Sequence, residues 1–237
     1  MPIPLHIRKP SRAIVQSVVS FGFSPFLILA TDSILLIALN AALQYHGGAQ
    51  GDMLITCATI AQSYLMLITS PMIGITGGSQ PLISLAYGEG KYHITKTVRN
   101  LAYRFAFGVA AICAVILFLL RGDAAYLFGT SETVAVRVAQ ILPIFIVGFV
   151  FVSVSRVTTA YFYAMGKNLW AYVLIYGEPL TLCVLLLILP NAMGSVDGTW
   201  ISVPLSQIIA MLISVLLIRK NRIHEQQFAD TDVLPQE

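Results

Sequence analysis

Charged residues are scarce in this sequence. Asp, Glu, Lys and Arg make up 11% of the 237 residues, whereas they make up roughly 25% of an average soluble domain. Hydrophobic residues make up 57%, and the net charge is only +3. The composition therefore predicts an all-α polytopic membrane protein in a lipid bilayer. It does not support a nucleic-acid-binding surface, which requires a strong excess of basic residues.

Cysteines and histidines are also few. The three cysteines lie in apolar runs, which favours reduced thiols packed as small hydrophobic side chains over a disulfide framework. All four histidines fall in predicted loops or tails, namely His6, His46, His93 and His224. None of them can serve a Ser-His pair or a metal site inside the bilayer. We therefore predict that the chain is not an enzyme and needs no cofactor.

The stretch GGSQPLISLAYGEGK, residues 77–91, ends on a Gly-Lys pair as a phosphate-binding loop does. Such a loop also needs a glycine five residues before that pair and a Ser or Thr after the lysine. Leu85 and Tyr92 occupy those two positions. A long apolar run precedes the stretch, so we interpret it as the end of a membrane helix.

Six apolar segments separated by glycine-rich or polar turns predict six transmembrane helices. The segments are 14–45, 52–87, 94–120, 133–164, 168–189 and 198–218. They define one transmembrane unit at 14–219, a short N-terminal segment at 1–13 and a C-terminal tail at 220–237. Three segments exceed 30 residues, well above the ~20 residues of a straight span, so we expect tilts or kinks, with kinks at Pro25, Pro71, Pro81 and Pro143.

Basic residues alternate between the two sides of this predicted bundle. Only Arg121 and Arg137 fall on one side. Eleven fall on the other: Arg8, Lys9, Arg12, Lys91, Lys96, Arg99, Arg104, Lys167, Arg219, Lys220 and Arg222. Because cytoplasmic loops retain Lys and Arg, we predict that both termini are cytoplasmic in a multi-pass protein of a cell membrane, the bacterial inner membrane.

Three ionisable residues fall within the predicted spans: Asp32, Arg156 and Glu178. Each should face protein or water, because an ionised side chain facing lipid is costly. Arg156 and Glu178 lie at similar distances from the turn at Gly166, so an ion pair between them is geometrically plausible. Such a pair either fixes two helices or forms a gate or part of a substrate path.

Asp32 has no basic partner at its own depth. Pro25 precedes it by one heptad and frees the carbonyl of Phe21 on the same helix face. A carboxylate beside a free carbonyl resembles a cation site, which would exchange a proton or Na⁺. The alternative is a protonated Asp32 that hydrogen-bonds a neighbouring helix.

Two further features were interpreted from the sequence. The stretch GITGG, residues 74–78, favours close packing of two helix backbones, or else an interruption of the helix at a cavity. Trp170 and Trp200 fall near opposite membrane interfaces, where amphipathic aromatic rings are favoured.

Three stretches together carry a resemblance to a known family. GITGGSQPLISLAYGEGK resembles the signature of the second helix in the C-terminal lobe of multidrug and toxic compound extrusion (MATE) transporters. TTAYFYAMGKNLWAYVL resembles the end of that lobe's fourth helix, and VDGTWISVPLSQIIAMLISVLLI resembles its last helix. The likeness runs from about residue 14 to 219. One departure is Ala86, where the family usually has Asn.

The resemblance implies one six-helix lobe of a transporter that expels organic cations in exchange for Na⁺ or H⁺. It places the coupling-ion site at Asp32, and it makes Gln80 part of a helix that lines the lobe. Members have twelve helices in two lobes, so the chain would need a second lobe, either an N-terminal half or a second copy. The alternatives are a non-transporting orphan lobe or scaffold, or a flippase for lipid-linked substrates from the same superfamily.

Overall fold

The computed structural model describes residues 11–231, and the description covers the backbone alone at residues 13–14, 17–32 and 222–231. This part of the chain contains six α-helices and no strand. The helices are α1 (Arg12–Gly47), α2 (Gly51–Gly88), α3 (Tyr92–Leu119), α4 (Glu132–Ala164), α5 (Asn168–Met193) and α6 (Asp197–Thr231). Short 3₁₀ turns follow α1 at Gly48–Gln50 and α3 at Ala124–Phe128.

The six predicted segments correspond one to one with these helices. Most predicted ends agree within a few residues, but α6 continues from the predicted end at residue 218 to Thr231. The added residues, RKNRIHEQQFADT, are polar but include Arg, Lys, Gln and Glu, which are good helix formers. Loss of hydrophobicity thus ends the membrane-compatible run without ending the helix. The helices also continue through their prolines, including Pro71, Pro81 and Pro143.

Five stretches of the described helices are long and apolar enough to cross a membrane, judged by length and composition. They are Ser33–Gly88, Tyr92–Leu119, Glu132–Ala164, Asn168–Met193 and Asp197–Asn221. The first stretch combines the end of α1 with all of α2. The chain is a multi-pass membrane protein.

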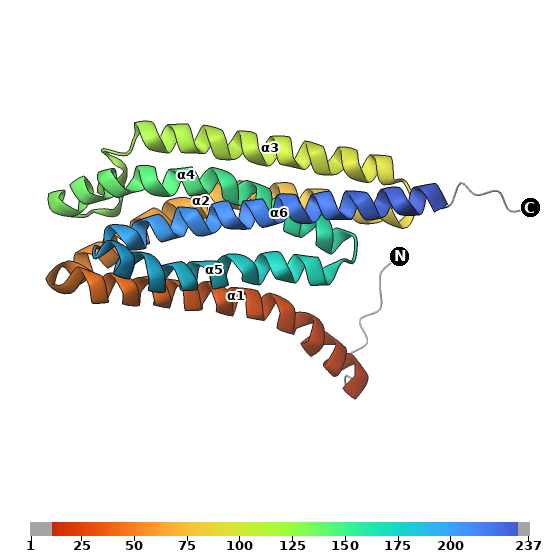
Figure 1. Ribbon diagram of the computed structural model, residues 1–237, viewed down its shortest axis with the longest axis horizontal. Coiled ribbons are helices and arrows are strands. Elements are labelled where there is room, and N and C mark those ends of the chain that lie inside the picture. The colour runs from red at the N-terminus through yellow and green to blue at the C-terminus, as the bar shows by residue number, and fades with distance from the viewer. Residues whose placement is uncertain (1–10, 232–237) are drawn as a thin grey trace, which may run out of the picture.

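The helices form one bundle in which the start of α1 and the end of α6 lie at the same end (Figure 1). We call this the basic end; it contains the α2–α3 and α4–α5 turns and the C-terminal part of α6. The opposite end contains the α1–α2, α3–α4 and α5–α6 connections. Helix α4 packs against α2, α3, α5 and α6, so it forms the centre of the bundle. The N-terminal part of α1 bends away from the other helices (Figure 1).

The aromatic core lies between α4 and α6 towards the opposite end. Phe145 and Phe149 are fully buried on α4, and Trp200 of α6 is 1% exposed. The ring centroids of Phe145 and Trp200 are 5.9 Å apart. The Trp200 ring therefore fills the space between two helices, and the expectation that it lies near a membrane interface stays a prediction. Trp170 is only half-buried, and Lys220 Nζ lies 5.4 Å from its ring centroid.

Close backbone approaches occur at glycines other than those of GITGG. A Cβ placed on Gly198 would lie 2.6 Å from the backbone nitrogen of Pro190, and one on Gly148 would lie 2.9 Å from the Cα of Pro204. The first contact joins α5 to α6 and the second joins α4 to α6. By contrast, nothing lies within 4 Å of a Cβ on Gly74, Gly77 or Gly78. The close-packing interpretation of GITGG is therefore wrong for this chain by itself.

Candidate functional site

Three tyrosines line up beside the turn that joins α4 to α5. Tyr163 lies in the last turn of α4, and Tyr172 and Tyr176 lie one helical turn apart on α5. The ring centroids of Tyr163 and Tyr172 are 6.1 Å apart, and those of Tyr172 and Tyr176 are 6.2 Å apart. All three side chains are half-buried. We call this group the tyrosine strip.

The local sequence explains why these tyrosines meet. Gly166 has φ 71°, a left-handed conformation that L side chains rarely adopt, and it reverses the chain between the two helices. Lys167 N donates a hydrogen bond to Phe162 O at 2.9 Å, which closes the end of α4. Residues four apart share a helix face, so Tyr172 and Tyr176 both lie on the side of α5 nearest Tyr163.

Arg156 extends the tyrosine strip along α4. It precedes Tyr163 by seven residues, which is about two helical turns, so the two side chains lie on one face. The Arg156 side chain is exposed, and Thr159 between them is half-buried. Ser153 precedes Arg156 by three residues on the same side of α4, but it is 1% exposed and donates to Val150 O at 2.6 Å. Ser153 therefore belongs to the core and not to the strip.

The structure does not show the predicted ion pair between Arg156 and Glu178. The ion pairs seen between described side chains are Lys91–Glu89 at 2.8 Å and Arg137–Asp197 at 3.8 Å. Equal distance from the turn sets equal depth, but it does not set the direction in which a side chain points. Glu178 follows Tyr176 by two residues, about 200° around α5, so it lies away from the face that carries the tyrosine strip.

The other two predicted site residues lie on α1 and α2. Asp32 falls within α1, but its side chain lies outside the described residues. Gln80 is half-buried on α2. The structure therefore positions the backbone of Asp32 in a membrane-length helix and leaves its proposed role as a prediction.

One side of α2, in the same part of the helix as Gln80, is exposed in the described chain. Gly74, Gly77, Gly78 and Pro81 recur at intervals of three and four residues, which places them together on one side of the helix. All four are exposed, and the three glycines have open space around them. This α2 glycine face is thus available to lipid or to another polypeptide.

Tyr172 and Tyr176 are the site residues that our sequence analysis missed. The signal was their spacing of four residues in a predicted helix, directly after the turn that follows Tyr163. An apolar run with occasional tyrosines is typical of an ordinary membrane helix, so the spacing alone does not mark a site. Only their packing against Tyr163 distinguishes them.

The fold defines a multi-pass helical membrane protein, and the comparisons show its family. The family profile MatE matches residues 29–187, which is more than half of the chain. The chain therefore belongs to the MatE family, whose members are transporters. Among curated proteins, none matches the sequence.

Solved structures show the same fold. The chain resembles the outward-facing conformation of a multidrug resistance MATE family transporter, with TM-score 0.81, 22% identity, and coverage of 95% of this chain and 50% of the other. It also resembles MATE in the straight conformation, with TM-score 0.81, 22% identity, and coverage of 92% of this chain and 49% of the other. A MOP superfamily transporter from Pyrococcus furiosus, described as having a binding pocket of reverse polarity, matches with TM-score 0.79, 23% identity, and coverage of 90% and 48%. The chain thus spans about half the length of these structures.

Proposed function

We propose that this chain is the C-terminal lobe of an antiporter that exports organic cations in exchange for Na⁺ or H⁺. The observation that carries the proposal is the MatE match over residues 29–187, on a six-helix bundle that covers about half of each similar transporter. One neighbouring structure is described as a multidrug resistance transporter. A bundle of this size corresponds to one lobe of a two-lobe transporter.

The α2 glycine face supports a second lobe as the missing partner. Substrates of such transporters bind near the midplane between structural repeats. Gly74, Gly77 and Gly78 meet no other part of this chain, so another lobe can approach the α2 backbone closely there. Gln80 lies in the same part of α2, where it would line the path between the lobes. The second lobe is an N-terminal half or a second copy of this chain.

The tyrosine strip supports an organic cation as the substrate. The face of a tyrosine ring attracts a cation within about 6 Å, most strongly where water is excluded. Tyr163, Tyr172 and Tyr176 are half-buried, so each keeps some surface for a ligand. Asp32 is the proposed coupling-ion site, and Arg156 and Glu178 are proposed to gate or line the path.

Transport into vesicles tests this proposal. The purified chain is reconstituted with an imposed Na⁺ or H⁺ gradient and a fluorescent organic cation, and cross-linking reports its assembly. We expect gradient-driven transport by the wild type and its loss in Asp32→Asn. The matched control is Asp52→Asn, which removes the same charge from an exposed position in the first turn of α2.

Each result has a distinct meaning. Full activity in Asp32→Asn contradicts the coupling role, and transport by a strictly monomeric chain contradicts the need for a second lobe. Absence of transport from a well-folded dimer favours the non-transporting orphan lobe.

A flippase for lipid-linked anionic substrates is the second candidate. The observation that favours it is Arg156, an exposed cation in the middle of α4 on the same face as the tyrosine strip. One similar structure is described as having a binding pocket of reverse polarity and a different function. The same vesicles loaded with a fluorescent lipid-linked pyrophosphate decide between the two, since only a flippase moves that probe between leaflets.

A further inference from the structure

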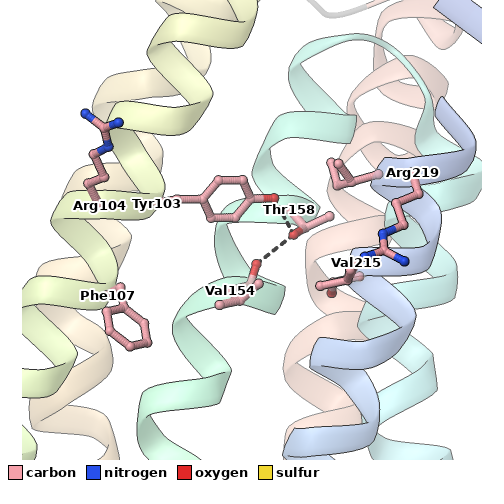
Figure 2. Close-up of a pocket in the computed structure, with 9 residues that line it drawn as sticks. Tyr103, Arg104, Phe107, Val154, Thr158, Val215 and Arg219 are labelled. Carbon is pink, nitrogen blue, oxygen red and sulfur yellow. Dashed lines mark hydrogen bonds between the residues drawn. The ribbon is translucent and has the colours of Figure 1, made fainter. Parts of the chain in front are cut away.

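A groove of about 490 Å³ lies between α3, α4 and α6, on a different side of α4 from the tyrosine strip (Figure 2). This volume falls within the range of small-molecule sites. Its apolar walls are formed by Phe107 of α3, Val154 of α4, and Val215 and Ile218 of α6. A hydrocarbon chain is therefore compatible with most of its surface.

Each hydroxyl group in the groove already donates its hydrogen bond to a protein atom, so none can donate to a ligand. Thr158 Oγ1 donates to Val154 O at 2.7 Å. The 2.7 Å contact between Tyr103 OH and Thr158 Oγ1 must then be donated by Tyr103. Ser214 Oγ donates to Ala210 O at 2.9 Å. Figure 2 shows the first two of these bonds in series across the floor of the groove.

Arg104 and Arg219 are the hydrogen-bond donors that remain. Arg104 is on α3 and Arg219 is on α6, on opposite sides of the groove, and the Arg104 side chain extends along α3 towards the basic end and not across the groove (Figure 2). Both side chains are exposed, and within the described residues neither has an ion pair or a hydrogen bond with protein. The groove thus combines an apolar interior with two unpaired positive charges.

Both arginines lie towards the basic end of the bundle. From Asp197 to Arg219, α6 rises roughly 33 Å at about 1.5 Å per residue, which is close to the ~30 Å thickness of a bilayer's hydrocarbon core. Arg219 is therefore at the level of lipid headgroups when Asp197 is at the other surface. Phe107 and Val215 lie about one helical turn deeper than Arg104 and Arg219 respectively, at the level of acyl chains.

We infer that this groove binds an anionic phospholipid, with its headgroup at the rim of the groove near Arg104 and Arg219 and one acyl chain along Phe107, Val154 and Val215. Arginine suits this role because its planar guanidinium binds phosphate oxygens bidentately. Lipids are the molecules that a membrane brings to this surface, and charge complementarity selects the anionic ones. The inference does not depend on whether the chain transports a substrate.

Native mass spectrometry of the full chain in detergent tests the inference. Phosphatidylglycerol and phosphatidylcholine with identical acyl chains are added in equal amounts, and the ratio of bound adducts is measured. We expect the wild type to prefer phosphatidylglycerol. A basic residue near an anionic lipid surface contributes about a fivefold preference, so Arg104→Gln with Arg219→Gln should reduce the ratio by about 25-fold.

Two variants and one control separate the charge from the shape of the groove. The Arg104→Lys, Arg219→Lys double variant keeps both charges and should retain most of the preference. Val215→Trp fills the groove while leaving both arginines, and it should reduce the number of bound lipids of both kinds. Arg121→Gln removes one charge from the opposite end and should leave the ratio unchanged.

Three results of the lipid-binding comparison would overturn the inference. They are equal binding of the two lipids to the wild type, an effect of Arg121→Gln as large as that of the double Gln variant, and full lipid binding by Val215→Trp. If the double Gln variant fails to fold, the amount of lipid bound by Val215→Trp decides whether lipid occupies the groove. Competition by inorganic phosphate at millimolar concentration would likewise overturn it, because a free anion would then suffice.

Discussion

The rings of Tyr163 and Tyr172 stand edge to face across the α4–α5 turn, with their centroids 6.1 Å apart and their planes at 88°. This contact links two helices through half-buried polar aromatic residues in a protein whose spans are otherwise apolar. Buried tyrosines usually serve packing. A half-buried pair beside an exposed arginine is better suited to contact a ligand, and this distinction can be tested.

Removing a ring from the tyrosine strip should weaken recognition of an organic cation. We expect Tyr172→Ala to raise the KM for transport about fivefold, which corresponds to a cation–π contribution of ~1 kcal/mol. Tyr172→Phe keeps the ring and should stay close to the wild-type KM. An equal loss in both variants would point to the hydroxyl group and contradict a cation–π role.

Gly198 should be far less tolerant of a side chain than Gly77. In Gly198→Ala the new Cβ would meet the backbone of Leu189 and Pro190 at 2.6–2.7 Å, and such overpacking typically costs about 1–3 kcal/mol. Gly77→Ala is the matched control, because nothing lies within 4 Å of its Cβ. Thermal unfolding in detergent should show a lower Tm for Gly198→Ala alone; equal Tm values would refute the close contact.

Arg156 and Glu178 should show no energetic coupling. Because they form no ion pair, the double-mutant cycle of Arg156→Gln and Glu178→Gln should give an interaction energy within about 0.5 kcal/mol of zero. Arg156→Gln alone should leave the free energy of unfolding nearly unchanged, since its side chain is exposed. Recovery of stability by the charge-swapped Arg156→Glu, Glu178→Arg variant would restore the ion pair as an explanation.

Trp200 should contribute more to stability than Trp170. Replacing the buried Trp200 by Ala removes a ring that packs on Phe145, and truncations of this kind cost about 3–5 kcal/mol. Trp170→Ala removes a half-buried ring and should cost less. Denaturant unfolding in micelles measures both, and a larger loss for Trp170→Ala would contradict the assigned core.

Tags at the two termini should both be shielded in intact cells. The start of α1 and the end of α6 lie at the same end of the bundle (Figure 1), and the eleven-to-two distribution of basic residues predicts that this end is cytoplasmic. A membrane-impermeant reagent should label a C-terminal tag only after permeabilisation. Labelling of intact cells would reverse the predicted orientation.

Much of the fold could be predicted from the sequence because a bilayer restricts the choices. Backbone N–H and C=O groups in lipid must form their hydrogen bonds within a helix, so each long apolar run is expected to be helical. The glycine-rich turns mark where these runs end. The same reasoning underestimated α6, since hydropathy detects membrane compatibility and α6 continues as a helix of polar residues to Thr231. The positions of Gln80 and Arg156 along their helices were also predictable.

The sequence by itself determined that this chain is an all-helical, multi-pass membrane protein of the MatE family, because hydrophobicity, turn residues and local motifs are properties of neighbouring residues. Only the tertiary structure decided how the helix faces are directed. It placed Trp200 in the core, formed no ion pair between Arg156 and Glu178, opened the α2 glycine face and brought Tyr163 against Tyr172. The physical reason is that distance from a turn fixes depth, whereas the rotation of a helix about its axis is fixed by packing against all of its neighbours.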